Sequence, residues 1–239
     1  MIISIYNTIL YQPLFNLLVF FYNLAPANDL GIAILFLTIV VKIILFPFFT
    51  QSIKAQKALA EIQPKVDELN KKFKDQKEKL GKELMELYKR EKVNPFSSCL
   101  PLIIQLPFLI AVFQVFRNGL TNGSLNILYP FVNNPETINT ISLGIINLAE
   151  KSVILAILAG IAQFWQTKMI MSKKVMKTKS NSMAGNMNKQ MVYVMPVITI
   201  FIGSSLPAGL TLYWLLTTVF SGLQQLLIFR KPKNLANNG

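Results

Sequence analysis

The stretch Asp29–Thr50 reads DLGIAILFLTIVVKIILFPFFT, and it decides how the rest of the chain is interpreted. From Leu30 to Phe49 it is apolar almost without interruption, and about 20 such residues cross the hydrocarbon core of a bilayer. One charge, Lys42, lies near its middle, with Thr38 one helical turn earlier on the same face. The sequence therefore predicts a membrane-spanning helix that carries a polar patch.

Two interpretations of Lys42 are open. Its long side chain can reach the nearer headgroups, or its ammonium can line a polar cavity inside the protein. A lysine at mid-membrane costs roughly 2.5–3.5 kcal/mol on insertion scales. Because Lys42 is far from both ends of the apolar stretch, we favour the cavity.

Composition restricts the class of protein. Of the 239 residues, 52% are hydrophobic, and uninterrupted apolar runs of this kind indicate a polytopic membrane protein. The 24 Lys and Arg outnumber the 11 Asp and Glu, which suits anionic lipid or RNA as a partner. There is no histidine, so histidine metal sites and catalytic triads are excluded. Cys99 is the single cysteine, which excludes an intrachain disulfide, and we interpret it as a small buried hydrophobe.

Residues 1–24 carry a polar stripe on an otherwise apolar helix. The stripe consists of Ser4, Thr8, Gln12 and Asn16, with Asn7 and Tyr11 beside it. Such a stripe favours a helix that lies in the membrane interface over one that spans the bilayer. The segment has no early Lys or Arg and no small-residue cleavage site, so it does not resemble a signal peptide.

Residues 51–94 have the composition of a segment outside the membrane. The apolar residues recur every three or four positions in two arms, Leu59–Phe73 and Leu80–Leu87. This spacing predicts an antiparallel helical hairpin with its turn around Asp75–Gly81 and a bend at Pro64. Its twelve basic and eight acidic residues make it a charged, solvated element.

The remaining apolar runs complete an all-α architecture of five spans, with connecting segments between them. The expected segments are an interfacial helix at 1–24, spans at 29–50, 95–118, 151–171, 191–206 and 208–229, the hairpin at 51–94, an extracytoplasmic loop at 119–150, a basic loop at 172–190 and a basic tail at 230–239.

Basic residues give the direction of these spans. The hairpin holds twelve Lys and Arg, the Lys168–Lys189 stretch six and the tail three, while the opposite side holds only Arg117 and Lys151. The positive-inside rule makes the first three regions cytoplasmic. We therefore expect a multi-pass protein of the cell membrane with the N-terminus outside and the C-terminus in the cytoplasm.

Several motifs in order along the chain resemble the YidC/Oxa/Alb family of membrane protein insertases. They are LGIAILFLTIVVKIILFPF from Leu30, LYKREKVNPFSSCLPLIIQLPF from Leu87, MPVITIF from Met195, PAGLTLYW from Pro207 and SGLQQLLIFR from Ser221. The blocks around Asn94-Pro95 and Pro207 are the specific ones. The resemblance covers nearly the whole chain, from Gln12 to Arg230.

The resemblance implies a five-helix core around a polar groove that opens to the cytoplasm and is closed outside. By position in the motif, Lys42 is the positive residue of that groove, where relatives more often have arginine. Lysine keeps the charge but lacks the guanidinium fork that grips a carboxylate with two hydrogen bonds. Thr38, Gln105, Gln163 and Trp214 are the other groove candidates. For the glutamines an interhelical hydrogen bond is an open alternative, as is an interfacial anchor for Tyr213 and Trp214.

The resemblance also implies the partners, which are nascent membrane proteins, the lipid bilayer and, through the hairpin or basic segments, the Sec channel and the ribosome. We expect no bond-changing catalysis, no cofactor, no metal and no specific small-molecule ligand, since no nucleotide-binding GxxxxGK[ST] motif is present. Two other functions are weighed against insertion. A small channel or solute transporter would use Lys42 as an anion site, and an assembly factor would only chaperone folding beside the Sec channel.

Overall fold

The computed structural model describes residues 2–95, 100–119, 124–170 and 183–230, and these are almost entirely helical. The only strands in these ranges are two short ones, β1 (Ile141–Ser142) and β2 (Ile146–Asn147). The predicted all-α class is confirmed. Most of the basic loop at 172–190, nearly all of the tail at 230–239 and Cys99 lie outside the described residues.

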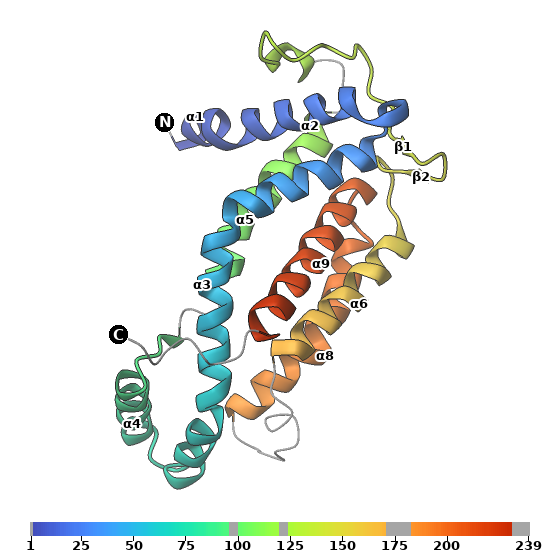
Figure 1. The fold of residues 1–239 in the computed structure, drawn as a ribbon. Helices are drawn as coiled ribbons and strands as arrows, with labels where there is room; N and C mark the ends of the chain where they lie inside the picture. The colour runs from blue at the N-terminus through green and yellow to red at the C-terminus, as the bar shows by residue number, and fades with distance from the viewer. Residues whose placement is uncertain (1, 96–99, 120–123, 171–182, 231–239) are drawn as a thin grey trace.

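The N-terminal segment is one helical rod that lies across the end of the bundle (Figure 1). It consists of α1 (Ile2–Tyr6), a π-helical turn η1 (Asn7–Tyr11) and α2 (Gln12–Leu24). The wider turn comes just before Pro13, whose ring would clash with a carbonyl of the preceding turn in a regular α-helix. Pro13 therefore does not break the rod.

The polar stripe of this rod serves two purposes. Ser4, Asn7 and Thr8 are exposed, whereas the amides of Gln12 and Asn16 donate to the carbonyl of Ile127, in the loop between residues 119 and 153, at 3.1 and 3.2 Å. Half of the stripe therefore fastens a loop that lies more than a hundred residues away in the sequence.

Helix α3 (Leu30–Lys72) is longer than we predicted. We expected a helix ending near Thr50, but it runs on through Pro47 and Pro64 for 43 residues and contains the first arm of the hairpin. Each proline removes only one hydrogen bond, and the residues from Gln51 onward are mostly strong helix formers, so the helix continues with changes of direction (Figure 1). At 1.5 Å per residue it is about 65 Å long, about twice the hydrocarbon thickness.

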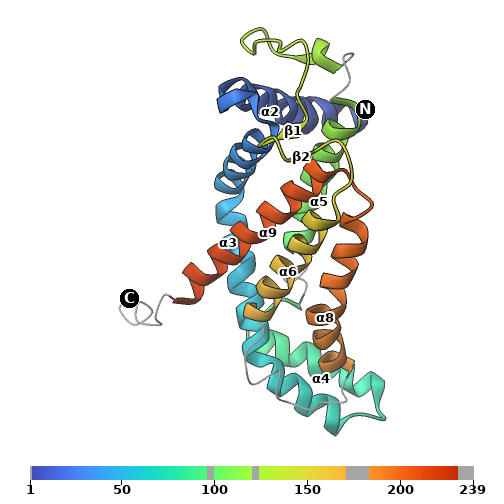
Figure 2. The same cartoon turned by 90° about the vertical axis from the view of Figure 1, so that its right-hand side faces the viewer.

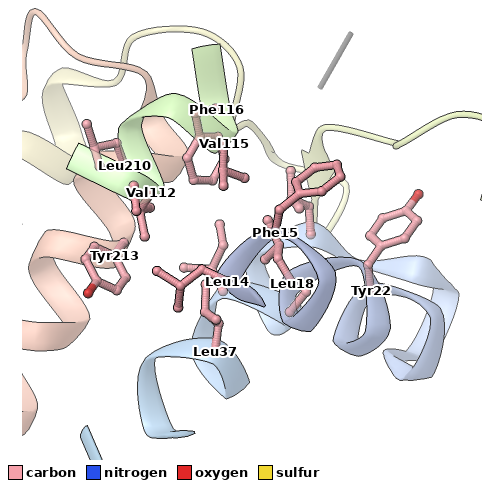
Figure 3. Packing of buried hydrophobic residues seen from close by; sticks show 14 of the residues in the cluster. Leu14, Phe15, Leu18, Tyr22, Leu37, Val112, Val115, Phe116, Leu210 and Tyr213 are labelled. Carbon is pink, nitrogen blue, oxygen red and sulfur yellow. The ribbon is translucent and has the colours of Figure 1, made fainter. Parts of the chain in front are cut away.

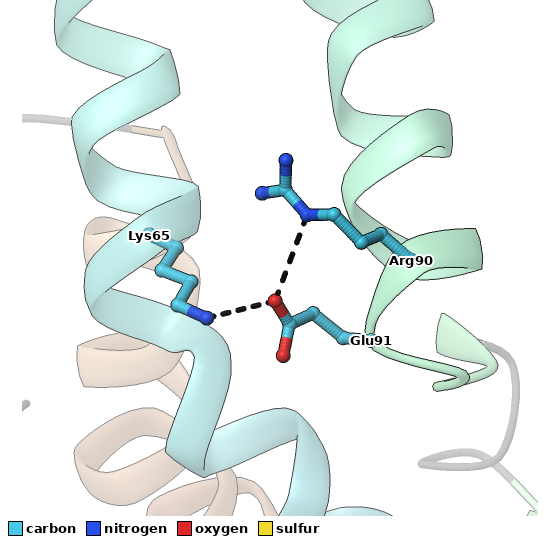
Figure 4. A network of polar contacts seen from close by, with 3 residues as sticks. All are labelled: Lys65, Arg90 and Glu91. Carbon is cyan, nitrogen blue, oxygen red and sulfur yellow. Dashed lines mark hydrogen bonds and ion pairs between the residues drawn. The ribbon is translucent and has the colours of Figure 1, made fainter.

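The predicted antiparallel hairpin forms between the end of α3 and α4 (Lys77–Arg90). Its turn covers Phe73–Gln76, slightly earlier than the predicted Asp75–Gly81. Ile62, Val66 and Phe73 are buried on one arm and Leu87 on the other, as the spacing of apolar residues indicates. Across the arms, the Lys65 ammonium lies 2.7 Å from the Glu91 carboxylate (Figure 4).

The other helices complete the bundle. They are α5 (Leu100–Gln114) with a π-helical turn η4 (Val115–Gly119), α6 (Val153–Ile170), α8 (Met183–Gly203) and α9 (Ala208–Arg230). Helix α8 begins eight residues before the predicted span at 191, and a short turn at Ser204–Pro207 separates it from α9, where we expected the break.

Helices α6, α8 and α9 pack closely because small residues lie at their contacts (Figure 2). A Cβ on Gly160 of α6 would collide with Ile200 of α8, and a Cβ on Gly222 of α9 would collide with the Trp165 ring. Two of the described helices, Leu30–Lys72 and Ala208–Phe229, are long and apolar enough to cross a bilayer, and Ile103–Arg117, Val153–Met169 and Val192–Gly203 are shorter apolar stretches.

Most of the main apolar core lies at the α2 end of the bundle (Figure 3), and it extends along α3 as far as Phe49. Side chains from four helices meet there, among them Phe15 of α2, Leu37 of α3, Val112 of α5 and Tyr213 of α9, all almost fully buried. Gly209 of α9 lies directly beneath the Phe116 ring, where a Cβ would not fit. This end of the bundle is therefore tightly packed, and the polar residues described next lie nearer the hairpin.

Candidate functional site

Lys42 lies in the middle of the apolar half of α3, and its side chain is directed toward α9. The residue is 8% exposed, and its Nζ donates a hydrogen bond of 2.6 Å to Ser221 Oγ. The ammonium also lies 4.1 Å from the centre of the Phe49 ring, within range of a cation–π interaction. Lys42 is thus held inside the protein instead of reaching for a membrane surface.

Ser221 is oriented to receive this hydrogen bond. Its hydroxyl donates to the carbonyl of Thr217 at 2.8 Å, which leaves the oxygen lone pairs available as acceptors. An ammonium has three N–H donors, and Ser221 is its one hydrogen-bond partner among the described residues. Lys42 therefore keeps donors with which it can bind a further group.

Ser221 belongs to a row of buried polar residues on α9, which we call the α9 polar face. Its members are Ser221 and the four buried polar residues that lie three or four positions from it, which are Thr217, Thr218, Gln224 and Gln225. All are less than a tenth exposed, in a helix that is otherwise apolar. A continuous polar row in such a helix indicates a polar interior and not lipid contact.

Two glutamines extend this polar region toward the hairpin. Gln224 Nε2 donates to the Phe46 carbonyl at 3.1 Å and to Thr50 Oγ1 at 2.9 Å, which fastens α9 to α3 one turn beyond Lys42. Gln225 is 2% exposed, and within the described ranges its Oε1 has no hydrogen-bond partner. A buried acceptor in this state is a place for a water molecule or for a donor of a bound chain.

Gln105 forms an interhelical hydrogen bond, as one of the two interpretations of it requires. Its Nε2 donates to the Tyr213 hydroxyl at 3.0 Å and joins α5 to α9. Tyr213 is fully buried, so the interfacial-anchor alternative is wrong for this residue. Trp214 is half-buried, and its carbonyl accepts from both Thr217 and Thr218 at 2.8 Å. Trp214 thus borders the α9 polar face through its backbone, whereas the Gln105 amide reaches α9 at Tyr213.

The remaining two candidates differ from each other. Thr38 is fully buried one turn before Lys42, and its hydroxyl donates to the Ile34 carbonyl of its own helix at 2.7 Å. Gln163 is half-buried on α6, where its carbonyl accepts from Thr167 at 2.8 Å. Within the described part of the chain, no hydrogen bond joins Gln163 to Lys42 or to the α9 polar face.

The interpretation of the sequence missed most of the α9 polar face. Thr217, Ser221 and Gln225 follow one another at intervals of four, which is the same signal that revealed the stripe in residues 1–24. Only the fold, however, shows that this row is directed toward Lys42, because 179 residues separate Lys42 from Ser221.

The charge of Lys42 is not neutralised within the described ranges. The ion pairs found there involve Lys65, Lys82 and Arg90, all on the hairpin, and none involves Lys42. No group of three or more His, Cys, Asp or Glu in these ranges is arranged to hold a metal ion. The arrangement is thus a buried cation in polar surroundings, suited to attracting a carboxylate or a carbonyl oxygen.

Comparison with known proteins places this arrangement in context. Residues 20–235 match the family described as 60Kd inner membrane protein. The chain is 32% identical over 224 residues to a membrane protein insertase YidC of Fusobacterium nucleatum, which covers 93% of this chain and 98% of that protein. It is 36% identical over 189 residues to a YidC of Clostridium tetani (79% and 76% covered) and 31% identical over 226 residues to a YidC 2 of Listeria innocua (93% and 71% covered).

Proposed function

This chain belongs to the YidC family of membrane protein insertases, and on that premise we propose that it inserts hydrophobic segments of nascent proteins into the cell membrane. The observation that carries the mechanism is the buried, unneutralised ammonium of Lys42 beside the α9 polar face. A nascent segment brings a polar flank with it, and that flank is the part that apolar lipid rejects.

In this mechanism Lys42 and the α9 polar face form the wall of a polar groove. The N–H donors that Ser221 does not use bind an acidic side chain or a backbone carbonyl of the flank. Gln225 Oε1, which is buried without a partner among the described residues, accepts from a backbone N–H. Each contact lowers the cost of bringing polar groups partway into the membrane.

The groove opens toward the hairpin and is closed at the α2 end. Support for this asymmetry comes from the packing, since most of the main apolar core lies at the α2 end while the α9 polar face lies nearer the hairpin. A flank can therefore enter from the cytoplasm and reach Lys42, but it meets a closed wall beyond.

We further propose that α3, α5, α6, α8 and α9 all span the membrane. The chain then crosses five times, with the N-terminus outside, the hairpin in the cytoplasm and the rod of residues 1–24 in the outer interface. The distribution of Lys and Arg supports this orientation. The many exposed apolar residues on α5 and α8, such as Ile103 and Phe201, support contact of these helices with lipid.

The apolar part of the substrate leaves between α5 and α8. Its transfer into lipid releases about 25 cal/mol per Å² of apolar surface, so the step requires no nucleotide hydrolysis and no change of any covalent bond. The hairpin receives the substrate or contacts the Sec channel, and the basic segments attract ribosomal RNA by charge.

The test is insertion of a single-span substrate into vesicles containing the purified protein. We expect the substrate to become protected from protease only in vesicles that carry the protein. If insertion is the same in empty vesicles, the insertase proposal fails. A chaperone that acts only beside the Sec channel would be active only when that channel is also present. A channel or transporter would conduct anions without inserting the substrate.

A further inference from the structure

The strands β1 and β2 form a small hairpin in the loop between α5 and α6. Ile141 pairs with Asn147 and Ser142 with Ile146, and the Ile145 N–H donates to the Ser142 carbonyl at 3.0 Å. The two central residues of the turn, Leu143 and Gly144, have φ angles of +52° and +69°. Positive φ at both positions is the signature of a type I′ turn, and because Ser142 pairs with Ile146, Ile145 remains as an extra residue after the turn.

Leu143 is an unusual residue for this turn. Its position normally holds Asn, Asp or Gly, because a larger side chain is strained at positive φ. The leucine side chain is also 71% exposed, so packing within the protein does not explain it.

The exposure pattern of the hairpin is the reverse of that expected in water. Ile141, Leu143 and Ile145 are 50%, 71% and 81% exposed, while the polar Ser142 between them is buried. An antiparallel pair with one face in water turns its polar residues outward. No charged residue occurs between Glu136 and Glu150 in the sequence. This surface is therefore suited to an apolar environment.

Asp29 holds the β1–β2 hairpin in this orientation. Its Oδ1 accepts from Ser142 Oγ at 2.7 Å and from the Ile32 N–H at 3.0 Å, and its Oδ2 accepts from the Leu143 N–H. Because Asp29 is also the cap of α3, the hairpin is fixed to the beginning of the first core helix. The apolar tip is thus presented by a fixed support and not by a free loop.

The β1–β2 hairpin projects sideways from the bundle, beside the corner where α2 meets α3 and above the first turn of α6 (Figure 1). The loop that contains η5 (Ser124–Ile127), in contrast, passes over the far side of α2. Val153 and Ile154, which begin α6, are 59% and 70% exposed. The apolar tip therefore lies on the same side of the bundle as the exposed apolar start of a helix that we place in lipid.

We propose that Ile141, Leu143 and Ile145 insert into the outer leaflet of the membrane, at the boundary between headgroups and acyl chains. The proposal rests on the membrane arrangement given under Proposed function. Lipid is the occupant that the observations favour over a second protein, because the apolar tip lies above the first turn of a helix that we place in lipid and no charged residue occurs between Glu136 and Glu150. The β1–β2 hairpin then acts as a second interfacial anchor beside the N-terminal rod.

Fluorescence quenching in vesicles tests this anchor. The protein, with Cys99→Ser, receives Ile145→Cys and an environment-sensitive nitrobenzoxadiazole label. The matched control is Thr137→Cys, an exposed residue in the polar part of the same loop. We expect phosphatidylcholine with a nitroxide near the carbonyl end of its acyl chain to quench the label at 145 several-fold more than that at 137. Iodide on both sides of the membrane should quench in the opposite order.

Two results would overturn the proposal. Equal iodide quenching at both positions would place the tip in water. Protection of position 145 from iodide and from nitroxide lipid alike would mean that protein covers it.

A second variant separates lipid contact from the turn itself. Leu143→Asn suits a type I′ turn better, so the melting temperature in detergent should not fall, while nitroxide quenching of the label at 145 should decrease. Unchanged quenching would contradict a role of Leu143 in lipid contact. Insertion of the single-span substrate is measured in the same vesicles. If neither the labelled nor the unlabelled protein inserts the substrate, the result counts against the proposed function and not against the anchor.

Discussion

The ammonium of Lys42 and the hydroxyl of Ser221 meet at 2.6 Å across the interface of α3 and α9, although 179 positions separate them in the sequence. This contact joins a charge that is costly in a membrane to the polar row that makes it tolerable. If the α9 polar face and Lys42 act together on the substrate, changes at either residue should affect the same class of substrates.

The charge at position 42 should be required for substrates with acidic flanks. We expect Lys42→Arg to retain insertion, whereas Lys42→Ala and Lys42→Glu should reduce it about tenfold, which corresponds to about 1.4 kcal/mol in the barrier. The measurement is protease protection of two single-span substrates that differ only in an acidic or an amide-containing flank. The substrate with the amide-containing flank is the control, and its insertion should fall much less in these variants. Equal activity of all three variants on the acidic flank would remove the role of the charge.

Ser221 should act as a positioning residue for Lys42. Ser221→Ala removes the acceptor at 2.6 Å and leaves a buried ammonium short of a partner, a cost of about 1–3 kcal/mol in stability. It should also reduce the preference for acidic over amide flanks, and Ser221→Thr should restore that preference. Thr211→Ala is the matched control, because it removes a buried hydroxyl of the same helix that donates to Gly203 and not to Lys42. A change of flank preference in the control would mean that any disturbance of α9 has this effect.

The close contact of Gly209 with Phe116 should make the α2 end of the bundle sensitive to a single methyl group. Gly209→Ala places a Cβ against a buried ring and should destabilise the protein by about 1–3 kcal/mol, measured as a lower melting temperature in detergent. Gly81→Ala gives the comparison. Gly81 lies in α4 with no atom within 4 Å of the added Cβ, so alanine should stabilise by about 0.5–1 kcal/mol through its helix propensity. A change of stability in the same direction at both positions would contradict the packing described for Gly209.

The ion pair between the hairpin arms should make their contact depend on pH. The hydrogen bond from Lys65 lowers the pKa of Glu91 below its ordinary value, so the ionised carboxylate favours the closed hairpin. This contribution is present above the ordinary pKa of a glutamate and is lost as the pH falls through the lowered pKa. Spin labels at Glu68→Cys and Met85→Cys, one on each arm, should report a broader distance distribution in acid.

Two variants check the origin of this effect. Glu91→Gln should show the broad distribution already at neutral pH and little further change in acid. Glu78→Gln, which loses a pair with Lys82 inside α4, should behave like the unchanged protein because that pair does not join the arms. If Glu91→Gln keeps the full pH dependence, another group controls the hairpin.

The sequence predicts most of the helices and several of their buried faces correctly. The spacing of Ile62, Val66, Phe73 and Leu87 predicts which hairpin residues are buried, because an antiparallel pair of helices has one apolar seam. The break between α8 and α9 likewise follows from the Gly and Pro near residue 207. The end of α3 was predicted wrongly, because a change from apolar to polar composition marks the exit from a membrane and does not by itself end a helix.

By itself, the sequence determined the helical class, the buried seam of the hairpin and the presence of a charge inside an apolar helix, since these depend on periodicity and on residues close together in the chain. Only the tertiary structure decided what the charge meets. The hydrogen bonds from Lys42 to Ser221, from Gln105 to Tyr213 and from Ser142 to Asp29 each join residues more than a hundred positions apart. No local pattern encodes such contacts, because they depend on how whole helices pack and on which of their faces meet.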